Sequence, residues 1–462
     1  MALTELRLLL AEALQGSELL EKSYFAGGAV RDYLLFGTGY ELGPDVDIAV
    51  EVPEGGRLLA ELIHERLNTS KPVVYNTFGT ASVVLDGLSL EFVHTRKESY
   101  RQHDRKPEVS FGTLKEDALR RDFGINALYM KISDGSILDP GGKGLHDIEN
   151  KIIACVDDPD RVFSEDPLRL LRAVRFASRL GFEIEAKTYE AIVRDREQLE
   201  HISQERIAME FEAMLLEEEA GKVIAAIRLL ADTGILAVIL PEVDALRGLT
   251  QNKYHHLDAF EHTLLVLQNS EPTLIARWAA LLHDIGKAHT KSFKADGSVT
   301  FIGHDKLGAT MAYELLRRFS VPKRSRELIS KLVGGHMVFK QSGEEGLHIK
   351  DSTLLRLADR YKDDLWLLLD LVEADNSAHA PQYRMPKQVV CLRRRFAQLK
   401  SNLPRFNLTG RDLLQEFGIS TSRKVGELLQ IAKQTWYEDP GLGKKQLLEL
   451  IRPLVENDKE IP

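Results

Sequence analysis

The placement of strand-like segments constrains the fold of this chain more than any other feature of its sequence. Valine-rich runs bounded by turn residues predict strands, and those that we identify lie within the first 140 of the 462 residues. The expected strands are 24–28, 46–50, 72–76, 80–86 and 90–94, with a clear amphipathic helix at 55–68. From Asp157 onward the apolar residues recur at helical spacing. We therefore predict an α+β N-terminal region, with a small mixed sheet and helices, followed by an all-α remainder.

The length predicts several domains, each with its own core. At about 100–200 residues per domain, the chain holds two to four of them. We expect boundaries where the pattern changes, which gives the segments 1–150, 151–253, 254–380 and 381–462. Hydrophobic residues make up 44% and charged residues 28%, a balance that rules out wholesale disorder.

Three features of the composition predict where the protein is found. No stretch of about 18 residues is uninterruptedly apolar, which argues against a transmembrane helix and a membrane partner. The N-terminal segment contains Glu5, Arg7 and Glu12, which predicts an amphipathic helix rather than a signal peptide. Cys155 and Cys391 are the only cysteines, so neither a disulfide framework nor a cysteine zinc site is expected. We therefore expect a cytoplasmic protein.

Two glycines and two aspartates near the N-terminus form a candidate phosphate and metal site. Gly27 and Gly28 follow a predicted strand and open a helix, whose first N–H groups can point at an anion, and Arg31 adds a positive charge. Asp45 and Asp47 are two residues apart on a strand, so their side chains share one face. Like charges so close repel unless a cation lies between them, and carboxylates with substrate phosphates suit Mg²⁺. Each motif alone is more typical of a surface turn, but together they predict a two-metal phosphoryl-transfer site.

Five motifs occur in the order seen in class II tRNA nucleotidyltransferases and poly(A) polymerases, and the chain resembles that family. The motifs are GGAVRD at 27–32, the DVD pair at 45–47, RRDFGINAL at 120–128, ILDPGGKGLHDI at 137–148 and EDPLRLLRAVRF at 165–176. The resemblance implies a nucleotidyltransferase head in which Asp45 and Asp47 hold the metal ions and Arg121 contacts the nucleotide. The further candidates are Glu91 as a third carboxylate in a neighbouring strand, and Gly28, Arg31 and Asn126 at the nucleotide.

One residue departs from the pattern of this family. The usual threonine in the RRDFTINAL motif is Gly124 here, and we expect a local effect on the start of a helix rather than lost chemistry.

The last of these motifs carries charged residues at a spacing of three. We expect Asp166, Arg169, Arg172 and Arg175 on neighbouring faces of one helix, a stripe that is by itself typical of a solvated surface. Alternatively, a carboxylate accepts a hydrogen bond from the exocyclic amine of C or A while an arginine donates to the adjacent ring acceptor, and G or U would leave both unpaired. The resemblance assigns this base reading to Asp166 and Arg169 and places Arg172 and Arg175 toward the phosphates.

A long polar segment separates Glu91 from Arg120. Its basic residues are Arg96, Lys97, Arg101, Arg105 and Lys106. We expect a long loop, and such loops in compact domains are usually functional or disordered. In the family that the chain resembles, a flexible loop here separates enzymes that add the terminal A from those that add only C, so its presence disfavours a CC-only enzyme.

Histidines and aspartates on successive helices form a second candidate centre. The candidate ligands are His262, His283, Asp284, His304, His336 and Asp375. Neutral imidazoles and carboxylates at such intervals can converge on a metal, although single histidines in helices are more often packing or surface residues. Their order resembles the HD phosphohydrolase superfamily, which implies a divalent metal of unspecified identity and hydrolysis of phosphate esters. The alternative is an HD domain that keeps only a structural role.

The charge of the chain is negative overall but locally positive. The net charge is −9, which taken alone argues against nucleic-acid binding, although its distribution matters more than its sum. Residues 381–406 contain seven basic residues and no acidic one, a pattern that most often marks a solvated face. We predict that this tail instead holds the tRNA backbone, through Arg384, Lys387, Arg393, Arg394 and Arg395.

Together the motifs predict a head at 1–150, a helical nucleobase- and RNA-binding neck at 151–253, an HD domain at 254–380 and a basic tail at 381–462. The resemblance implies an enzyme that adds CCA, or its last A, to tRNA from CTP and ATP without a nucleic-acid template. A poly(A) polymerase shares the head motifs and stays open. A signalling-nucleotide synthetase/hydrolase also joins such domains, but its HD domain comes first in the chain. A non-catalytic RNA-binding protein is disfavoured because both aspartates are present, and the sequence leaves the oligomeric state open.

Overall fold

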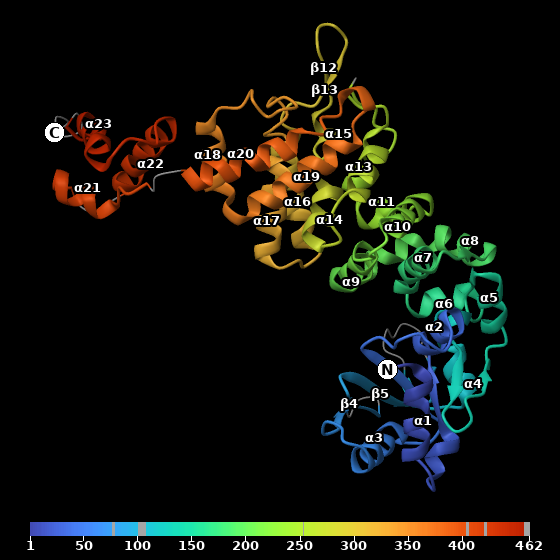
Figure 1. The fold of residues 1–462 in the computed structure, drawn as a ribbon. Helices are drawn as coiled ribbons and strands as arrows, with labels where there is room; N and C mark the ends of the chain where they lie inside the picture. The colour runs from blue at the N-terminus through green and yellow to red at the C-terminus, as the bar shows by residue number, and fades with distance from the viewer. Residues whose placement is uncertain (76–78, 100–107, 253, 403–405, 420–422, 457–462) are drawn as a thin grey trace. The chain divides into compact units, whose positions relative to one another are not determined.

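The chain forms two compact units, Met1–Pro241 and Glu242–Pro462 (Figure 1). The computed structural model describes residues 1–75, 79–99, 108–252, 254–402, 406–419 and 423–456. Among them, no helix combines the length and the apolar character that crossing a membrane requires. The expected boundaries at 150, 253 and 380 stay predictions.

A seven-stranded mixed sheet is the framework of the first unit. Its strands lie in the order β3-β4-β5-β2-β1-β8-β9, in which β2 and β5 are parallel and the other neighbours antiparallel. The strands are β1 (Ser23–Ala26), β2 (Asp45–Val50), β3 (Val73–Tyr75), β4 (Thr80–Leu85), β5 (Leu88–His94), β8 (Tyr129–Lys131) and β9 (Ile137–Leu138). The predicted α+β head with a mixed sheet is confirmed, and the DVD motif lies on the central strand, β2.

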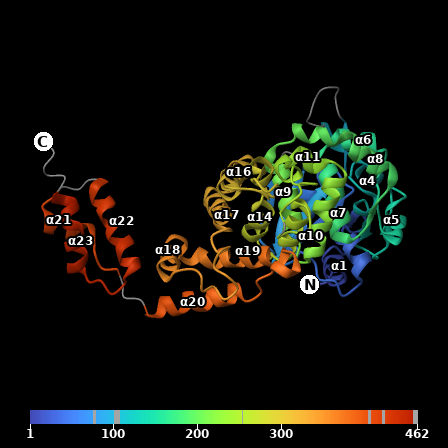
Figure 2. The same cartoon turned by 90° about the horizontal axis from the view of Figure 1, so that it is seen from above.

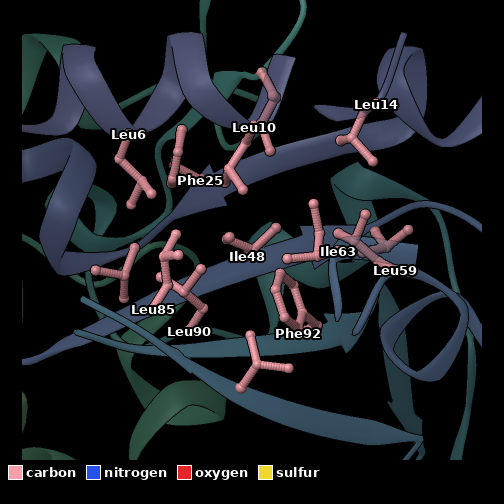
Figure 3. Close-up of a cluster of buried hydrophobic side chains, with 14 of the residues drawn as sticks. Leu6, Leu10, Leu14, Phe25, Ile48, Leu59, Ile63, Leu85, Leu90 and Phe92 are labelled. Atoms are coloured by element: carbon pink, nitrogen blue, oxygen red, sulfur yellow. The ribbon is translucent and has the colours of Figure 1, made fainter. Parts of the chain in front are cut away.

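Helices α1 (Leu3–Ala13) and α3 (Gly55–Arg66) pack on one face of this sheet. Their apolar side chains meet those of the inner strands in one buried cluster (Figure 3). The labelled members are Leu6, Leu10, Leu14, Phe25, Ile48, Leu59, Ile63, Leu85, Leu90 and Phe92. Burying one side chain of this size contributes about 1.5–3 kcal/mol to the stability of the folded state. Because Ile48 is buried in this cluster, its neighbours Asp47 and Ala49 on β2 face the other side of the sheet. The predicted N-terminal amphipathic helix is α1.

The polar segment after Glu91 is not one loop. It contains two paired strands, β6 (Arg96–Ser99) and β7 (Glu108–Phe111), and helix α4 (Leu114–Leu119). The expectation of a continuous loop was therefore wrong, because a two-stranded ribbon buries little apolar surface and lacks the hydrophobic pattern that reveals a strand. Three of the basic residues named above, Arg101, Arg105 and Lys106, lie outside the described residues.

The remainder of the first unit is almost wholly helical, as predicted. Its elements are α2 (Gly28–Phe36), η2 (Gly124–Asn126), α5 (Gly144–Asn150), α6 (Pro159–Glu165), α7 (Leu168–Leu180), α8 (Ala186–Asp195), η3 (Arg196–His201), α9 (Gln204–Leu215), α10 (Ala220–Asp232) and α11 (Ile235–Ile239). Strands β10 (Ile152–Ile153) and β11 (Glu183–Ile184) form a short parallel pair. Helix α7 packs against both α9 and α10.

The second unit is a helical domain followed by a small helical bundle. The domain comprises α13 (Ala259–Gln268), α14 (Leu274–Leu282), α15 (Lys287–Thr290), α16 (His304–Arg318), α17 (Lys323–Gly335), α18 (Asp351–Tyr361), α19 (Leu365–Ala378) and α20 (Gln388–Asn402), with a ribbon of β12 (Ser292–Phe293) and β13 (Val299–Thr300). The bundle consists of α21 (Gly410–Phe417), α22 (Arg423–Glu438) and α23 (Lys444–Glu456), which lie side by side in Figure 2. Its core contains Leu413, Leu428, Trp436 and Leu447.

Candidate active site and candidate metal centre

Three carboxylates converge at the centre of the sheet in the first unit. Asp45 and Asp47 lie on the open face of β2, and Val46 and Ile48 lie on the buried face. In the parallel pairing of β2 with β5, Asp47 is directly beside Glu91. The structure thus brings the two predicted metal ligands and the predicted third carboxylate together.

The electrostatics of this cluster fit a cation. Although the Asp47 residue is open to solvent on one side, desolvation of its carboxylate raises its pKa, Arg121 opposes the rise and Asp45 adds to it. Desolvation, followed by the charges of Asp47 and Asp45, also raises the pKa of Glu91. An all-oxygen donor set in which like charges repel suits Mg²⁺.

A glycine turn brings the start of α2 to the same place. Gly27 has φ +66°, and a β-carbon there would lie 3.1 Å from Nη1 of Arg121 and 3.7 Å from Oδ2 of Asp47. Arg121 and Asp47 therefore both lie beside this turn. Arg31 is buried, at 3% exposed, and its Nη1 donates to Oδ1 of Asn126 at 2.7 Å.

The charged residues of the last motif do not form one helical stripe. Helix α6 ends at Glu165, Asp166 follows it in an extended conformation, and α7 begins only at Leu168, so the expectation that one helix carries all four was wrong. The cause is Pro167, which disfavours helical geometry at the residue before it.

The predicted base-reading pair is also differently connected. Oδ2 of Asp166 accepts from Nη2 of Arg206 on α9 at 2.7 Å. Arg169 donates to Glu165 and to the carbonyl oxygens of Val162 and Arg120. The side chains of Asp166 and Arg169 therefore pair with other protein groups and not with each other.

Arg172 and Arg175 belong to a network that the sequence did not reveal. Asp122 accepts from Arg172 at 2.8 Å and from Asn126 at 3.1 Å. Glu210 on α9 accepts from Arg172 at 3.3 Å and from Arg175 at 2.6 Å.

Three guanidinium groups of this region surround one buried aromatic ring. The guanidinium carbons of Arg31, Arg172 and Arg175 lie 5.1, 5.2 and 4.5 Å from the centre of the Phe176 ring. Such distances are typical of cation–π contacts. Neither Phe176 nor Glu210 could be identified from the sequence, because an apolar residue within a helix and a single surface-type carboxylate carry no pattern.

The second unit holds a buried cluster of histidines and aspartates. His262 (α13), His283 and Asp284 (after α14), His304 (α16), His336 (after α17) and Asp375 (α19) are all below 9% exposed. Nε2 of His283 lies 3.1 Å and Nε2 of His304 lies 3.4 Å from the Asp284 carboxylate. Nε2 of His262 lies 2.9 Å from Oδ1 of Asp375. Three helices, and the segments that follow two others, thus bring all six predicted ligands into one centre.

The orientation of these rings fits a metal. Nδ1 of His283, His304 and His336 lies 2.8, 2.7 and 2.6 Å from the carbonyl oxygens of Ala280, Phe301 and Val333. A proton on Nδ1 satisfies each carbonyl and leaves Nε2 with a lone pair toward the aspartates, as metal-ligating histidines require. Burial lowers the pKa of His336 to about 3, so this ring is neutral at pH 7. Two triads, His262–His283–Asp284 and Asp284–His304–His336, have ligand atoms close enough to share an ion.

Further polar residues surround this centre. Nζ of Lys287 lies 2.6 Å from Oδ2 of Asp284. The ring of His255 lies 4.4 Å from that of His262, and the ring of His379 lies 5.0 Å from that of His255 and 5.9 Å from that of His262. The sequence did not single out either residue, because neither belongs to a recognisable motif. A cavity of about 850 Å³ opens onto the cluster, and Lys287, Lys294 and Lys340 line it. Its volume lies in the range of small-molecule sites, and the lining also includes the carboxylates of Asp284, Asp296, Asp305 and Asp375.

The basic tail is partly engaged within the protein. Arg393 pairs with Asp370, and Arg395 binds Asp351 and the carbonyl oxygens of Gly346 and Ile349. The remaining predicted contacts, Arg384, Lys387 and Arg394, are exposed. The absence of acidic residues from 381–406 therefore does not leave Arg393 and Arg395 unpaired, because their counter-charges come from α19 and α18.

Comparisons with known proteins place this chain in one family. The chain matches the family models for the poly A polymerase head domain at 23–154, a probable RNA and SrmB-binding site of polymerase A at 181–247, and the HD domain at 255–364. It is 31% identical over 422 residues to an A-adding tRNA nucleotidyltransferase of Deinococcus radiodurans, covering 87% of this chain and 89% of the relative. It is 35% identical over 355 residues to a multifunctional CCA protein of Pseudomonas fluorescens, covering 74% and 80%. It resembles the crystal structure of the Bacillus stearothermophilus CCA-adding enzyme in complex with CTP, with a TM-score of 0.64, 27% identity and coverage of 97% and 98%.

Proposed function

The chain belongs to the class II family of CCA-adding tRNA nucleotidyltransferases and poly(A) polymerases, and from this premise we propose that it transfers nucleotides from CTP and ATP to the 3′ end of tRNA. The observation that carries the proposal is the pairing of Asp47 with Glu91 on adjacent strands, with Asp45, Arg121 and the Gly27 turn around it. These are the groups that phosphoryl transfer needs: carboxylates for metal ions and a positive charge for the phosphates.

The reacting groups are positioned by residues of this chain. Asp45 and Asp47, supported by Glu91, would hold Mg²⁺, which would supply charge stabilisation for phosphoryl transfer. Arg121 and the N–H groups at the start of α2 receive the phosphates. Because the carboxylates lie on a central strand whose other face is buried, they are held rigidly, and little reorganisation accompanies the reaction.

Base selection is assigned to Asp166 with Arg169. Asp166 accepts from the amine that C and A share, and Arg169 donates to the adjacent ring acceptor. In the absence of a nucleotide, the Asp166 carboxylate is paired with Arg206. Arg206 is exposed, so it can move aside or share the carboxylate when the base binds.

Two relatives differ in what their names say they add, the terminal A or CCA, and one experiment decides between these products. Transcripts of tRNA that end before C, after CC and after CCA are incubated with each nucleotide alone, and the products are sized at single-nucleotide resolution. Full CCA synthesis predicts C addition to the first transcript and A addition to the second. An A-adding enzyme extends only the second transcript. Long adenylate tails on the third would identify a poly(A) polymerase instead, and no extension of any transcript would overturn the proposal.

The second unit supports a second activity, hydrolysis of phosphate esters at the HD centre. The observation that favours it is the set of three Nε2 atoms that share the Asp284 carboxylate at the end of a lysine-lined cavity. A divalent ion at this centre would supply an activated water. The test is metal content and hydrolysis of p-nitrophenyl phosphate by the full chain loaded with Mn²⁺, Co²⁺ or Ni²⁺, for wild type, Asp284→Asn and the exposed control His289→Ala. Bound metal without hydrolysis would show that the centre is structural.

We also propose that tRNA is held by the exposed basic residues of the tail, and that the four expected segments act as head, neck, HD domain and tail.

A reducing, cytoplasmic location accords with the two free cysteines, Cys155 and Cys391.

A further inference from the structure

Asp117, on α4, is a buried carboxylate with an unusual number of donors. It is 1% exposed, and no motif or comparison gives it a role. Its Oδ1 accepts from Nε and Nη2 of Arg120, at 2.9 and 2.8 Å, and from the backbone N–H of Arg96 at 3.2 Å. Its Oδ2 accepts from the hydroxyl of Tyr129 at 2.6 Å and from Nη2 of Arg121 at 3.3 Å.

The Tyr129 hydroxyl closes a triangle between Asp117 and Arg121. It donates to Asp117 and accepts from Nε of Arg121 at 3.1 Å, and the Arg121 guanidinium lies 5.2 Å from the centre of the Tyr129 ring. Nη1 of Arg121 then donates to the carbonyl oxygen of Asn126 at 3.3 Å and faces Gly27. The guanidinium is therefore held at each of its nitrogen atoms.

The charges explain why this arrangement is stable although it is buried. Burial alone would raise the pKa of Asp117, but Arg121, Arg120 and the Tyr129 hydroxyl outweigh it and lower the pKa to about 2. A buried carboxylate of this kind needs paired charges and satisfied hydrogen bonds, and Asp117 has both.

We propose that Asp117, acting together with the Tyr129 hydroxyl, is the positioning residue that holds Arg121 beside Asp47 in the orientation that receives a nucleoside triphosphate. The inference rests on the proposed function and assigns it two residues besides the motif arginine. An unrestrained arginine loses side-chain freedom when it binds a phosphate, whereas Arg121 has lost that freedom before the nucleotide arrives.

The same carboxylate joins Arg121 to a second element. Asp117 accepts from the N–H of Arg96, which is the first residue of β6. Next to this contact, Oγ1 of Thr95 donates to the carbonyl oxygen of Gly112 at 2.6 Å and joins the two ends of the β6–β7 ribbon. One side chain thus ties the stem of the β6–β7 ribbon and the nucleotide-site arginine together, so removing it loosens both.

The test is a double-mutant cycle in the full chain. Tyr129→Phe keeps the ring but removes the hydroxyl, and Asp117→Asn keeps the shape but removes the charge. Each is expected to lower kcat/KM for CTP and ATP by about 10- to 100-fold, chiefly through KM, with the KM for tRNA unchanged. In an Arg121→Lys background, which cannot form the same contacts, the same two changes should have less than about a twofold further effect.

The outcomes separate this inference from the proposed function. If the wild type adds no nucleotide to tRNA, the proposed function fails. If the wild type is active but the effects of Tyr129→Phe and Arg121→Lys multiply, Asp117 and Tyr129 do not act through Arg121 and the inference is overturned. Should Asp117→Asn fail to fold by circular dichroism, the Tyr129→Phe cycle decides alone. Glu61→Gln, which removes a carboxylate from the surface of α3, is the matched control and should leave every parameter unchanged.

Discussion

A β-carbon added to Gly124 would lie 2.3 Å from Oδ2 of Asp147, so the missing side chain at position 124 makes room for that carboxylate. Asp147 is 4% exposed, and its Oδ2 has no hydrogen-bond partner among the described residues. The two residues belong to η2 and α5, which pack directly on each other. The departure from the motif threonine is thus more than the local helix-start effect expected from the sequence, because it determines the packing of a buried acid.

Gly124→Ala should destabilise the first unit. The added methyl group forces Asp147 or the backbone of α5 to move, which costs about 1–3 kcal/mol. Thermal unfolding should show a lower midpoint, and Asp147→Ala in the same chain should restore part of it. Gly221→Ala is the matched control, since nothing lies within 4 Å of the new methyl group in α10. An unchanged midpoint for Gly124→Ala would contradict the contact.

Asp147→Asn should stabilise the protein at neutral pH but not in acid. Burial is the main cause that raises the pKa of Asp147 to about 6, whereas in the unfolded chain it is near 3.8. Between these values the folded protein binds the proton more tightly, so stability falls as the pH rises from about 4 to 6. Asparagine removes that loss, which is at most about 3 kcal/mol above pH 6. The check is the free energy of unfolding in urea, measured for wild type and Asp147→Asn at pH 4.5 and pH 8. An equal difference between the two proteins at both pH values would refute the prediction. Asp134→Asn, at an exposed position, is the control.

Asp45→Ala or Asp47→Ala should abolish nucleotide addition and leave tRNA binding largely intact. Each removes a carboxylate from the place where phosphoryl transfer needs charge stabilisation, a loss on the order of 10³-fold or more. Single-turnover extension with Mg²⁺ measures the first effect, and filter binding of tRNA measures the second. Wild-type turnover by either variant would show that the site is assigned wrongly.

Asp166→Ala should change the choice of nucleotide. Loss of the accepting carboxylate should relax the rejection of UTP relative to CTP by roughly 1–3 kcal/mol, the scale of one base contact. Arg206→Ala should slow C addition. Because this variant keeps the Asp166 carboxylate, the ratio of catalytic efficiencies for CTP and UTP should not change. Catalytic efficiencies for all four triphosphates on tRNA lacking CCA test both statements. If Asp166→Ala lowers the catalytic efficiency for all four nucleotides by the same factor, Asp166 has only a structural role.

The arginines of the tail should differ from one another. Arg394→Ala should reduce the slope of tRNA affinity against log salt by somewhat less than one unit, as expected when one phosphate contact is lost. Arg395→Ala should instead lower the unfolding midpoint, because Arg395 is bound to Asp351 and to two carbonyl oxygens. Identical salt slopes for wild type and Arg394→Ala would show that this residue does not contact the tRNA backbone.

Much of the fold was predictable because it follows from local periodicity. The alternation in β2 places Asp45 and Asp47 on one face, since Val46 and Ile48 must be buried. The structure places this strand at the centre of the sheet. The β6–β7 ribbon was missed because it lacks that alternation. The helices of the second unit were likewise predictable, and four of the six candidate ligands, His262, His283, Asp284 and Asp375, lie on or next to strongly apolar helices.

The sequence by itself determined which groups are present and which of them share a strand or a helix, because the periods of 2 and 3.6 residues act over a few positions. Only the tertiary structure decided the partners of those groups. Arg206 reaches Asp166 across 40 residues, Tyr129 and Asp117 hold Arg121, and Asp351 neutralises Arg395, because burying one polar group requires another to come from a distant segment. Such pairings depend on how the helices and strands pack, and no local pattern encodes them.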